Sequence, residues 1–553
     1  MNLSGAEIIV HLLERQGITM VAGIPGGANL PLYNALHKSK IHHILTRHEQ
    51  AAGFIAQGMT RTTGKPAVCF ATSGPGATNL LTAIADAKLD SIPIVAITGQ
   101  VSSPLIGTDA FQEVDTYGMT IPITKHNFLI RSVEELFTVI PEAFRLASSG
   151  RPGPVLIDVP KDIQLKKIEF SEWPQPGKTS ATKPINIADI DRAIELIHAS
   201  TRPILYIGGG VVHSNSSEAL LSFARKNSIP ITPTLMGLGC VSATDPLNLG
   251  MLGMHGSQLT NRIMREADLL LAFGVRFDDR ATGKVSEFCP NAKIIHIDID
   301  SSEFNKIKKA DITISGDIGE AFALLTDRIK TDTRQVWNDY ITGEKENYPF
   351  PHKQPEDPLH PYNIIQTVES LVECDSIIST DVGQHQMWVA QYYPFKKPRT
   401  LLTSGGLGTM GFGLPTALGA AFANPKKRIV CFSGDGSILM NVQELATLAD
   451  YNLNVTVILF NNGHLGLVRQ QQELFFEKNF IASKFITNPD FSTIAKGFGI
   501  RSFDLTNETD VPGTLSRALS ETGPCFVNVP IRHELNVLPM VPPGAANYDS
   551  IGD

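Results

Sequence analysis

The amino-acid sequence predicts an α/β fold built from three doubly wound domains, each with a parallel sheet between helices. Short apolar strands alternate with helix-patterned segments along most of the chain, and this rhythm is typical of parallel sheets. With 553 residues the chain is too long for a single hydrophobic core, and about three domains is the usual division. Proline-rich segments at 174–184 and 349–361 interrupt the rhythm. The expected units are domains at 1–165, 186–340 and 358–530, and a tail at 531–553.

The first region justifies this class element by element. Ser4 and Glu7 stand at the spacing of a capping box before an amphipathic helix at 6–16. Apolar, β-branched runs then predict buried strands, each ending in a loop with glycine or polar residues. These strands are expected at 17–22, 41–46, 67–72 and 92–98, with helices at 51–61 and from about residue 77.

The middle region repeats the pattern, with strands expected at 203–207, 268–273 and 293–298. The first of these strands ends in Gly208, Gly209 and Gly210, which leave room for a ligand near the backbone. The third region shares the strand–glycine-loop–helix rhythm of the first, which is a weak indication of duplication. We expect the tail to pack across a surface of the protein.

Composition excludes several function classes. A net charge of −8 leaves no basic face for nucleic acid. No uninterrupted apolar run approaches the ~18 residues that a membrane-spanning helix needs. The six cysteines lack CxxC spacing and are typical of reduced core residues. We therefore expect a cytoplasmic protein without a signal segment, and neither nucleic acid nor a membrane as partner.

The most informative stretch is a strand–loop–helix–strand unit in the third region. A buried strand at 428–432 stops at the glycine-rich segment 433–437, which we expect to be neither strand nor helix. A helix at 440–451 and a strand at 455–460 follow. Such crossovers bring both strand ends to one sheet edge, so Asp435 and Asn462 should meet there.

A carboxylate and an amide oxygen suit Mg²⁺, which also takes phosphate oxygens, and glycines let backbone N–H groups approach those phosphates. An isolated Gly-Asp-Gly would be an ordinary turn, but the flanking elements favour a diphosphate site. The pattern resembles the signature of thiamine diphosphate enzymes. In that family Asp435, Asn462 and the carbonyl of His464 would hold the metal.

The same resemblance changes the interpretation of Glu49 and Met410. On local sequence alone, Glu49 would cap the helix that follows it, and Met410 would fill the core. In the family, the glutamate hydrogen-bonds N1′ of the aminopyrimidine and so promotes ionisation of the thiazolium C2–H. Burial raises a carboxyl pKa and would keep such a glutamate protonated. Met410 matches the apolar residue that holds the cofactor in a bent form.

Longer motifs narrow the resemblance to the catalytic subunits of biosynthetic acetohydroxyacid synthases, also called acetolactate synthases. The matching stretches are 25–27, 47–50, 72–79, 106–115, 149–154, 159–162, 275–280, 381–388 and 541–545. This resemblance implies a transferase that decarboxylates pyruvate and joins the remaining two-carbon unit to a second 2-keto acid. Pyruvate would give 2-acetolactate and 2-ketobutyrate would give 2-aceto-2-hydroxybutyrate, in the first common step of valine, leucine and isoleucine biosynthesis.

The resemblance also implies three bound groups, namely thiamine diphosphate, Mg²⁺ and FAD. Because the reaction has no net redox change, FAD would be structural. The residues expected around thiamine diphosphate are Pro25, Gly26, Glu49, Thr72, Asn79, Val382, Gly383, Gln384, His385, Gly408, Met410, Gly434, Gly436, Ser437, Leu465 and Gly466. The residues expected around FAD are Arg151, Gly208, Gly209, Gly210, Thr234, Leu235, Leu252, Gly253, Met254, His255, Gly274, Arg276, Asp278, Arg280, Asp298, Asp317 and Ile318.

The residues expected to be catalytic are Glu49, Gln112, Lys161, Arg276 and Met410. Arg276 is the candidate to bind the carboxylate of the second acid with two parallel hydrogen bonds, and its alternative role is a flavin contact or a structural ion pair. In the family Glu49 faces the metal site of another subunit, which implies at least a homodimer and leaves a tetramer open. A small regulatory subunit is a further implied partner.

One departure from the family bears on specificity. Leu467 and Gln471 stand where many members carry Met and Trp. The tryptophan would contact the extra methyl group of 2-ketobutyrate, and one methylene is worth ~1–3 kcal/mol of discrimination. We therefore expect a weak preference for 2-ketobutyrate and resistance to sulfonylurea-type inhibitors. This substitution resembles the isozyme I class.

Three other functions are compatible with parts of this pattern. A flavoprotein similar to pyruvate oxidase would pass electrons from the same decarboxylated unit to FAD. A glyoxylate carboligase is disfavoured because that enzyme lacks the glutamate found here as Glu49. A non-catalytic homologue that only binds cofactors is disfavoured because Glu49, Asp435, Asn462 and Arg276 are all intact.

Overall fold

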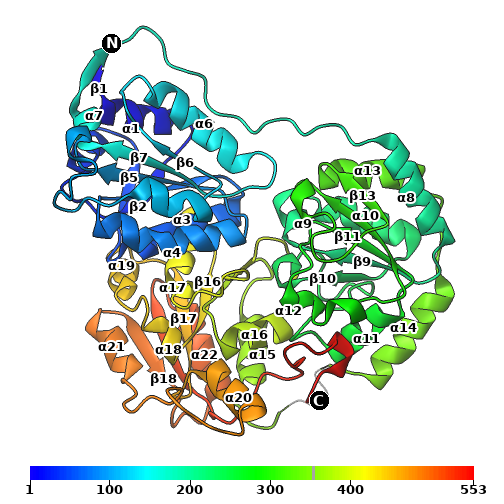
Figure 1. Cartoon of the computed structure of the whole chain (residues 1–553). Coiled ribbons are helices and arrows are strands. Elements are labelled where there is room, and N and C mark those ends of the chain that lie inside the picture. The colour runs from blue at the N-terminus through cyan, green and yellow to red at the C-terminus, as the bar shows by residue number, and fades with distance from the viewer. Residues whose placement is uncertain (351–354, 553) are drawn as a thin grey trace.

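The computed structural model describes residues 1–350 and 355–552 and contains three parallel sheets, each accompanied by helices (Figure 1). The expected α/β class with three doubly wound sheets is confirmed. Residues 351–354 of the expected second linker and Asp553 of the tail lie outside the described residues. The domain bounds given above stay a prediction.

The first sheet lies in the N-terminal third of the chain and has the strand order β3-β2-β4-β5-β7-β6. Ser4 and Glu7 form the expected capping box at the start of the first helix. The strands are β2 (Met20–Gly23), β3 (His42–Leu45), β4 (Ala67–Ala71), β5 (Ile94–Gln100), β6 (His126–Leu129) and β7 (Val155–Pro160). The helices are α1 (Gly5–Arg15), α2 (Leu30–Leu36), α3 (Glu49–Thr63), α4 (Pro75–Leu89), α5 (Thr116–Thr120), α6 (Leu136–Ser148) and α7 (Lys161–Leu165).

A small antiparallel pair, β1 (Asn2–Ser4) and β8 (Lys167–Glu169), closes the first domain. The chain then crosses to the middle domain as a long extended segment, which runs from β8 to α8 in Figure 1. None of the helices in residues 1–350 and 355–552 is long and apolar enough to span a bilayer.

The middle sheet has the order β10-β9-β11-β12-β13, so the strand order reverses between β9 and β11. Its strands are β9 (Pro203–Ile207), β10 (Ile231–Pro233), β11 (Leu269–Phe273), β12 (Lys293–Asp298) and β13 (Ile312–Ser315). The helices are α8 (Ile187–Ala199), α9 (Gly209–His213), α10 (Ser217–Asn227), α11 (Gln258–Glu266), α12 (Asp279–Thr282), α13 (Ile318–Arg328) and α14 (Gln335–Asn347).

The third sheet has the order β15-β14-β16-β17-β19-β18. Counted within its own domain, this is the same topology as the first sheet, which supports the indication of duplication. Its strands are β14 (Ile377–Thr380), β15 (Leu401–Leu402), β16 (Ile429–Gly434), β17 (Val455–Asn461), β18 (Arg501–Asp504) and β19 (Cys525–Pro530). The helices are α15 (Pro361–Leu371), α16 (Gln384–Tyr392), α17 (Gly413–Ala423), α18 (Asp435–Ile438), α19 (Glu444–Asp450), α20 (Gly466–Phe475), α21 (Phe491–Gly497) and α22 (Val511–Ser520).

The glycine-rich segment 433–437 differs from the expectation that it is neither strand nor helix. Strand β16 continues through Gly434, which pairs with Phe460 of β17, and Asp435 begins the short helix α18. The N–H of Gly434 donates to the Ser437 hydroxyl at 3.2 Å, so this side chain closes the turn. The absence of a side chain at Gly434 permits the close approach of the His385 ring, because a Cβ there would stand 2.8 Å from its Nδ1.

The tail after β19 joins the third domain to the middle domain. The N–H of Val541 donates to the carbonyl of Met254 at 2.8 Å, and the Asn547 amide donates to the carbonyl of Ala281 at 2.8 Å. Figure 1 shows this red segment beside α11. The expectation that the tail packs across a surface agrees with these contacts.

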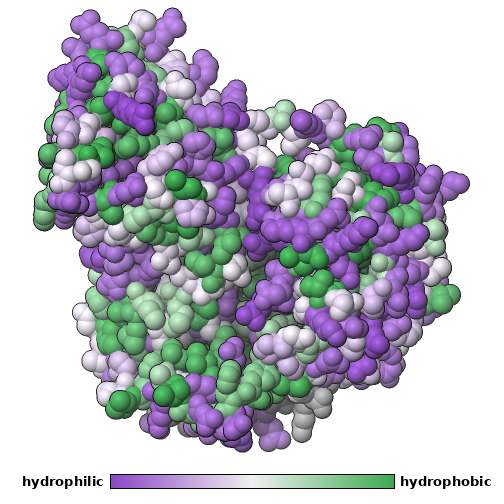
Figure 2. All heavy atoms as spheres, viewed as in Figure 1, coloured by the Kyte–Doolittle hydropathy of each residue, from purple (hydrophilic) through white to green (hydrophobic). Residues whose placement is uncertain are grey.

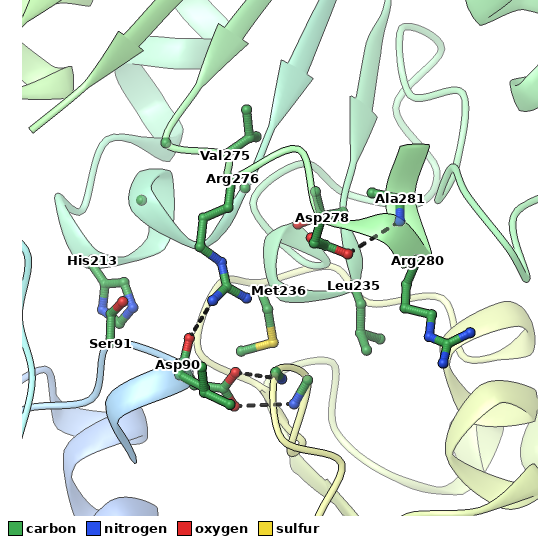
Figure 3. Close-up of a pocket in the computed structure, with 18 of the residues that line it drawn as sticks. Asp90, Ser91, His213, Leu235, Met236, Val275, Arg276, Asp278, Arg280 and Ala281 are labelled. Carbon is green, nitrogen blue, oxygen red and sulfur yellow. Dashed lines mark hydrogen bonds between the residues drawn. The ribbon is translucent and has the colours of Figure 1, made fainter. Parts of the chain in front are cut away.

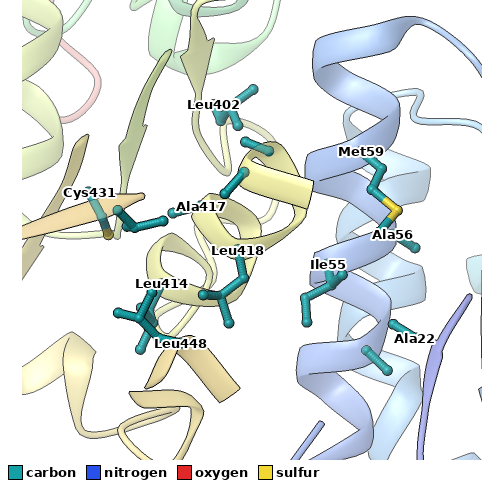
Figure 4. Close-up of a cluster of buried hydrophobic side chains, with 14 of the residues drawn as sticks. Ala22, Ile55, Ala56, Met59, Leu402, Leu414, Ala417, Leu418, Cys431 and Leu448 are labelled. Carbon is teal, nitrogen blue, oxygen red and sulfur yellow. The ribbon is translucent and has the colours of Figure 1, made fainter. Parts of the chain in front are cut away.

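The first and third domains are joined by helices α3 and α17, which share one hydrophobic cluster (Figure 4). Ile55 of α3 and Leu418 of α17 lie at the contact, and Leu414 continues the cluster toward the third sheet. Two glycines permit the close approach. A Cβ on Gly58 would overlap the carbonyl oxygen of Thr416, and one on Gly419 would overlap the carbonyl oxygen of Ile55.

We predict that Gly58→Ala destabilises the protein by about 1–3 kcal/mol, because the added methyl group forces the two helices apart. The measurement is the melting temperature of purified protein. Gly343→Ala is the matched control, because Gly343 lies inside α14 with nothing within 4 Å of the added methyl group. The control should melt at or above the wild-type temperature, since Ala favours a helix by ~0.5–1 kcal/mol over Gly. A Gly58→Ala protein as stable as wild type would contradict this account of the contact.

Candidate active site

A cavity of about 790 Å³ lies where the three domains meet. The end of α4 and the loop around Arg151 contribute one wall, the strand ends of the middle sheet a second, and the loop 404–408 of the third domain another. The space-filling view shows a recess between the domains on this face (Figure 2). This volume lies in the upper part of the ~300–1,000 Å³ range of small-molecule sites.

Three glycines of the middle domain lie at the point where its strand order reverses, which is where ligands bind in open α/β sheets. Gly208 follows β9 and Gly274 follows β11. A Cβ on Gly210 would stand 2.6 Å from the Gly274 Cα, and Gly274 has a φ of +59°, in the left-handed region. The absence of side chains therefore lets a ligand approach the backbone closely here, although the N–H groups of these three glycines already donate to the carbonyls of Phe273, Gly274 and Ile297.

Two carboxylates follow the next strands of the same sheet. Asp298 accepts a hydrogen bond from the N–H of Asp300 at 2.8 Å, and Asp317 caps α13 by accepting from the N–H of Glu320 at 3.0 Å. Burial raises the pKa of Asp298 to about 6. Each carboxylate uses one oxygen in these bonds, so the other oxygen is available for a ligand hydroxyl group. His255, on the far side of the cavity, has a buried Nδ1 without a partner among the described residues.

The cavity arginines differ in what they bind. Arg151 forms ion pairs with Glu303 at 2.6 Å and Asp300 at 3.3 Å, so it joins the first domain to the middle domain. Arg280 contacts the Met254 sulfur at 3.3 Å. Arg276 donates to the carbonyl of Leu89 at 2.8 Å (Figure 3), and no ion pair joins it to any residue in 1–350 or 355–552. Arg276 is therefore free to bind a ligand carboxylate.

Nearly all residues expected around FAD line this one cavity. Gly253 is the exception, and its N–H donates to the Asn261 side chain behind Leu252. Asp278 also caps α12 by accepting from the N–H of Ala281 at 3.2 Å (Figure 3). Residues from the expected set that line the cavity are Arg151, Gly208, Gly209, Gly210, Thr234, Leu235, Leu252, Met254, His255, Gly274, Arg276, Asp278, Arg280, Asp298, Asp317 and Ile318, together with Gly408, Leu467 and Gln471.

Asp435 and Asn462 lie together at the edge of the third sheet, because β16 and β17 are neighbours. One carboxylate oxygen of Asp435 accepts from the N–H groups of Asn462 at 3.2 Å and Gly463 at 2.6 Å, and the other accepts from Gly436 at 2.9 Å. The N–H of His464 donates to the Asn462 amide oxygen at 3.0 Å. Burial raises the pKa of Asp435 to about 6.

This group of oxygens fits a hard divalent cation. It offers one carboxylate, one amide oxygen and backbone carbonyls, which Mg²⁺ accepts when phosphate oxygens and water complete its shell. Among the described residues, no group of three or more His, Cys, Asp or Glu side chains could hold a metal by itself.

One ring nitrogen of a buried histidine beside this group lacks a hydrogen-bond partner. The ring of His385 packs against Gly434, and its Nε2 has no hydrogen bond in the described part of the chain. An unsatisfied buried polar atom costs ~1–3 kcal/mol, so a ligand oxygen at this position would stabilise the site. Neighbouring Gln384 is fixed by hydrogen bonds to Gln470 at 3.0 Å and to the carbonyl of Leu535 at 2.8 Å.

Met410 and Leu465 form the apolar side of this site. A Cβ on Gly436 would stand 2.7 Å from Leu465 and 3.7 Å from the Met410 methyl group, so both side chains lie over Gly436. The loop that carries Met410 is anchored by Asp381, which accepts from the N–H groups of Val382 at 2.9 Å and Gly411 at 2.7 Å. The remaining expected positions here are Gly383 and Gly466, which pack against His385 and Gln384, and Ser437.

The carboxyl edge of the first sheet carries the other expected group. Glu49 begins α3, is half-buried, and accepts a hydrogen bond from the Asn79 amide at 2.9 Å. Gly26, after Pro25, packs on Thr72 at the end of β4. The side chain of Glu49 therefore has one anchored oxygen and access to the outside of the domain.

Gln112 and Lys161 belong to the same edge. Gln112, in the loop after β5, has a φ of +59° and packs against Gly74. Lys161 begins α7 directly after β7, and no hydrogen bond or ion pair joins its ammonium group to a described residue. Neither these residues nor Glu49 lines the cavity that contains Arg276. Within a single chain, the expected catalytic residues are divided between two surfaces.

Sequence reasoning missed four charged residues beside the site, namely Arg61, Asp86, Asp90 and Asp381. All four are buried, and the first three stand in or next to apolar helices. Charged residues in such helices are the signal that could have found them, because a buried charge needs a partner. The hydroxyl and N–H donors that Asp86 and Asp90 bind in the third domain lie more than 300 residues away in the sequence, so spacing gave no guidance to them.

Comparison with known proteins places the chain in a class and then in a family. Family models of the thiamine pyrophosphate enzymes match the N-terminal thiamine pyrophosphate-binding domain at 3–119, the central domain at 190–325 and the C-terminal thiamine pyrophosphate-binding domain at 381–529. These three matches define a thiamine pyrophosphate enzyme.

The relatives define the family. The "Acetolactate synthase isozyme 1 large subunit" of Escherichia coli (strain K12) is 53% identical over 100% of this chain and 98% of that protein. The isozyme 2 large subunit of the same organism is 45% identical over 99% of each chain. The chloroplastic acetolactate synthase of Arabidopsis thaliana is 45% identical over 99% of this chain and 84% of that protein. The chain belongs to the family of acetolactate synthase large subunits.

Proposed function

We propose that this protein is the catalytic subunit of an acetolactate synthase that acts in branched-chain amino-acid biosynthesis. It would decarboxylate pyruvate and add the remaining two-carbon unit to a second pyruvate or to 2-ketobutyrate. The observation that carries the proposal is the match to acetolactate synthases along the entire chain, with every expected catalytic side chain present. We also propose a cytoplasmic location, and we keep the domain bounds 1–165, 186–340 and 358–530 as our division of the chain.

The residues described above have defined tasks in this reaction. Thiamine diphosphate, when bound, supplies the electron sink for loss of CO₂. Glu49 would hold a proton at N1′ of the aminopyrimidine, and the Asn79 amide would orient the Glu49 carboxyl. Asp435, Asn462 and the carbonyl of His464 would hold Mg²⁺ against the diphosphate.

Arg276 would bind the second acid. Its guanidinium has no carboxylate partner in the described part of the chain, and its planar fork matches a carboxylate. The Leu89 carbonyl occupies one N–H group and aims the remaining donors into the cavity. Lys161 and Gln112 would contact substrate from the first domain, and Met410 would shape the cofactor.

The division of these residues between two surfaces supports a homodimer. Glu49, Gln112 and Lys161 of one chain would complete the site that Arg276, Met410 and Asp435 begin in another. Exposed apolar side chains at Leu105, Phe111 and Ile121 flank Gln112, and Phe111 is 87% exposed. Apolar groups gathered on a surface are typical of an interface. A tetramer of two dimers and a small regulatory subunit remain further proposals.

FAD is the proposed occupant of the 790 Å³ cavity. The glycines, which have no side chains, leave room for its pyrophosphate. Asp298 and Asp317 would accept hydrogen bonds from its hydroxyl groups, and the unpartnered Nδ1 of His255 would make a further contact. The proposed reaction has no net redox change and needs no electron acceptor, so FAD would have a structural role and would stabilise the junction of the domains.

The first experiment is acetolactate formation from pyruvate, with thiamine diphosphate, Mg²⁺ and FAD each omitted in turn. Product that requires all three supports the proposal. The Glu49→Gln enzyme should lose about 10²-fold or more of its kcat, because positioned acid–base groups contribute ~10²–10⁴-fold. CO₂ release with flavin reduction but without acetolactate would overturn the proposal in favour of an oxidase.

A second prediction concerns FAD. Gly210→Ala places a methyl group 2.6 Å from the Gly274 Cα, and overpacking of ~1–3 kcal/mol weakens FAD binding roughly 5- to 140-fold. Equilibrium dialysis with flavin fluorescence measures the change. Gly343→Ala, remote from the cavity, is the control and should bind FAD as wild type does. Equal affinity in Gly210→Ala would exclude FAD from this cavity.

A third prediction concerns the choice of the second acid. Gln471 is exposed and lines the cavity with Arg276, so it offers space for a larger side chain. Gln471→Trp should raise the preference for 2-ketobutyrate over pyruvate about 10- to 200-fold, by an apolar contact to the extra methyl group. Competition between the two acids, read from the ratio of products, measures it. Gln471→Ala is the control without added apolar surface, and a Trp variant with the product ratio of the Ala variant would refute the role of this position.

A further inference from the structure

A buried cluster of one arginine and two aspartates joins the first domain to the loop that carries Met410. Arg61 of α3 donates to Asp90 at 2.8 Å and to Asp86 at 3.4 Å. Its guanidinium also lies 5.0 Å from the Phe412 ring centre and donates to the carbonyl of Thr403. Arg61 is 7% exposed, Asp86 0% and Asp90 5%, so water does not screen these charges.

The two carboxylates hold the segment 404–409 from one side. Asp86 accepts from the hydroxyl groups of Ser404 and of Thr409, the latter at 2.8 Å. Asp90 accepts from the N–H groups of Gly405 at 3.1 Å and Gly406 at 2.8 Å (Figure 3). Every one of these bonds crosses from the first domain to the third. Asp381, which lies in the third domain, accepts from the N–H of Gly411 at 2.7 Å.

We propose that Asp86 and Asp90 are positioning residues that fix the loop 404–410 and thereby set the place of Met410 over the cofactor. Met410 directly follows Thr409, whose side chain and backbone are both held in this network. The close fit of the glycines supports a fixed loop, because a Cβ on Gly406 would stand 2.8 Å from Leu89 and 3.0 Å from Asp90. The inference rests on the proposed function, since Met410 matters for catalysis only beside thiamine diphosphate.

The same turn of the first domain also receives Arg276. The carbonyl of Leu89 accepts from Arg276, and the next residue, Asp90, accepts from Gly405 and Gly406 (Figure 3). The end of α4 therefore sets the position of the Met410 loop relative to the proposed carboxylate-binding arginine. A displacement of this turn would move Arg276 and the Met410 loop together.

The test compares Asp90→Asn with wild type in two independent measurements. The first is hydrogen exchange of the peptide 404–411 in protein without added cofactors. Asn keeps one acceptor oxygen, places an NH₂ group against a backbone N–H, and removes the nearer of the two charge partners of Arg61. We therefore expect at least about tenfold faster exchange at Gly405 and Gly406. Exchange in β11 should not change, which distinguishes a local release from global unfolding.

The second measurement is kinetic. With thiamine diphosphate, Mg²⁺ and FAD at saturation, kcat for acetolactate should fall about 10- to 100-fold, because a shift of about 1 Å in a positioning element can cost ~10²-fold. KM for pyruvate should change less than about threefold, because the substitution leaves in place the Leu89 carbonyl that holds Arg276. The rate of C2–H deuterium exchange in bound thiamine diphosphate should fall with kcat, which a merely structural role would not produce.

Asp268→Asn is the matched control. Asp268 is also a carboxylate that holds a loop, by accepting from the N–H groups of Thr201 at 2.8 Å and Arg202 at 2.9 Å, but it precedes β11 at the opposite end of the sheet from the cavity. It should leave both readouts unchanged. Thr409→Val is the milder variant if Asp90→Asn does not fold, because it removes one hydroxyl group bonded to Asp86 and keeps the side-chain shape.

The proposal would be overturned if Asp90→Asn leaves both the exchange of 404–411 and kcat unchanged. If Asp90→Asn does not fold, the same result in Thr409→Val would overturn it. Faster loop exchange with normal kcat would overturn the link to Met410. A wild-type protein that makes no acetolactate would refute the proposed function instead, and the exchange measurement would still report whether the carboxylates hold the loop.

Discussion

The close contact of α3 with α17 is the constraint on which the site depends. Glycines at 58 and 419 bring the two helices together and one hydrophobic cluster continues through both domains. With α3 fixed against the third domain, α4 ends where the three domains meet, and its last turn reaches Arg276 and the loop 404–408. Burial of apolar area supplies most of this association, at ~25 cal/mol per Å². Polar contacts then decide how the surfaces are aligned.

Parallel sheets explain why so many functional groups gather in one place. Each sheet delivers its loops at the carboxyl ends of its strands, so the glycines of the middle domain, Asp435 of the third and Glu49 of the first all follow strands. The first and third sheets share one topology, and the two carboxylates lie at equivalent carboxyl edges, with Glu49 after β3 of the first sheet and Asp435 after β16 of the third.

Much of this arrangement could be predicted from the sequence, because strands with apolar runs and glycine-rich ends have local causes. The strand bounds of β9 and β12 matched the expected ranges, and the meeting of Asp435 with Asn462 followed from one crossover. The prediction that the segment 433–437 is neither strand nor helix was wrong, because local composition does not reveal that Gly434 pairs with Phe460. The roles of Asp86 and Asp90 could not be predicted, since their partners at 404–409 become neighbours only when the domains pack.

The energetics of that acidic pair explain why such a cluster would be kept. Burial and the neighbouring Asp90 raise the pKa of Asp86 to about 6, so two carboxylates facing one arginine form an unfavourable arrangement by charge alone. A buried ion pair contributes little net stability compared with apolar residues, but removal of one partner costs ~3–5 kcal/mol. Displaced arrangements of the two domains would keep the ion pairs of Arg61, but they would leave both carboxylates without their hydroxyl and N–H donors, at ~1.5–3 kcal/mol for each hydrogen bond to a charged group. The cluster therefore acts on alignment more than on affinity: apolar packing of α3 on α17 holds the domains together, and the charges select the one alignment that places the 404–410 loop.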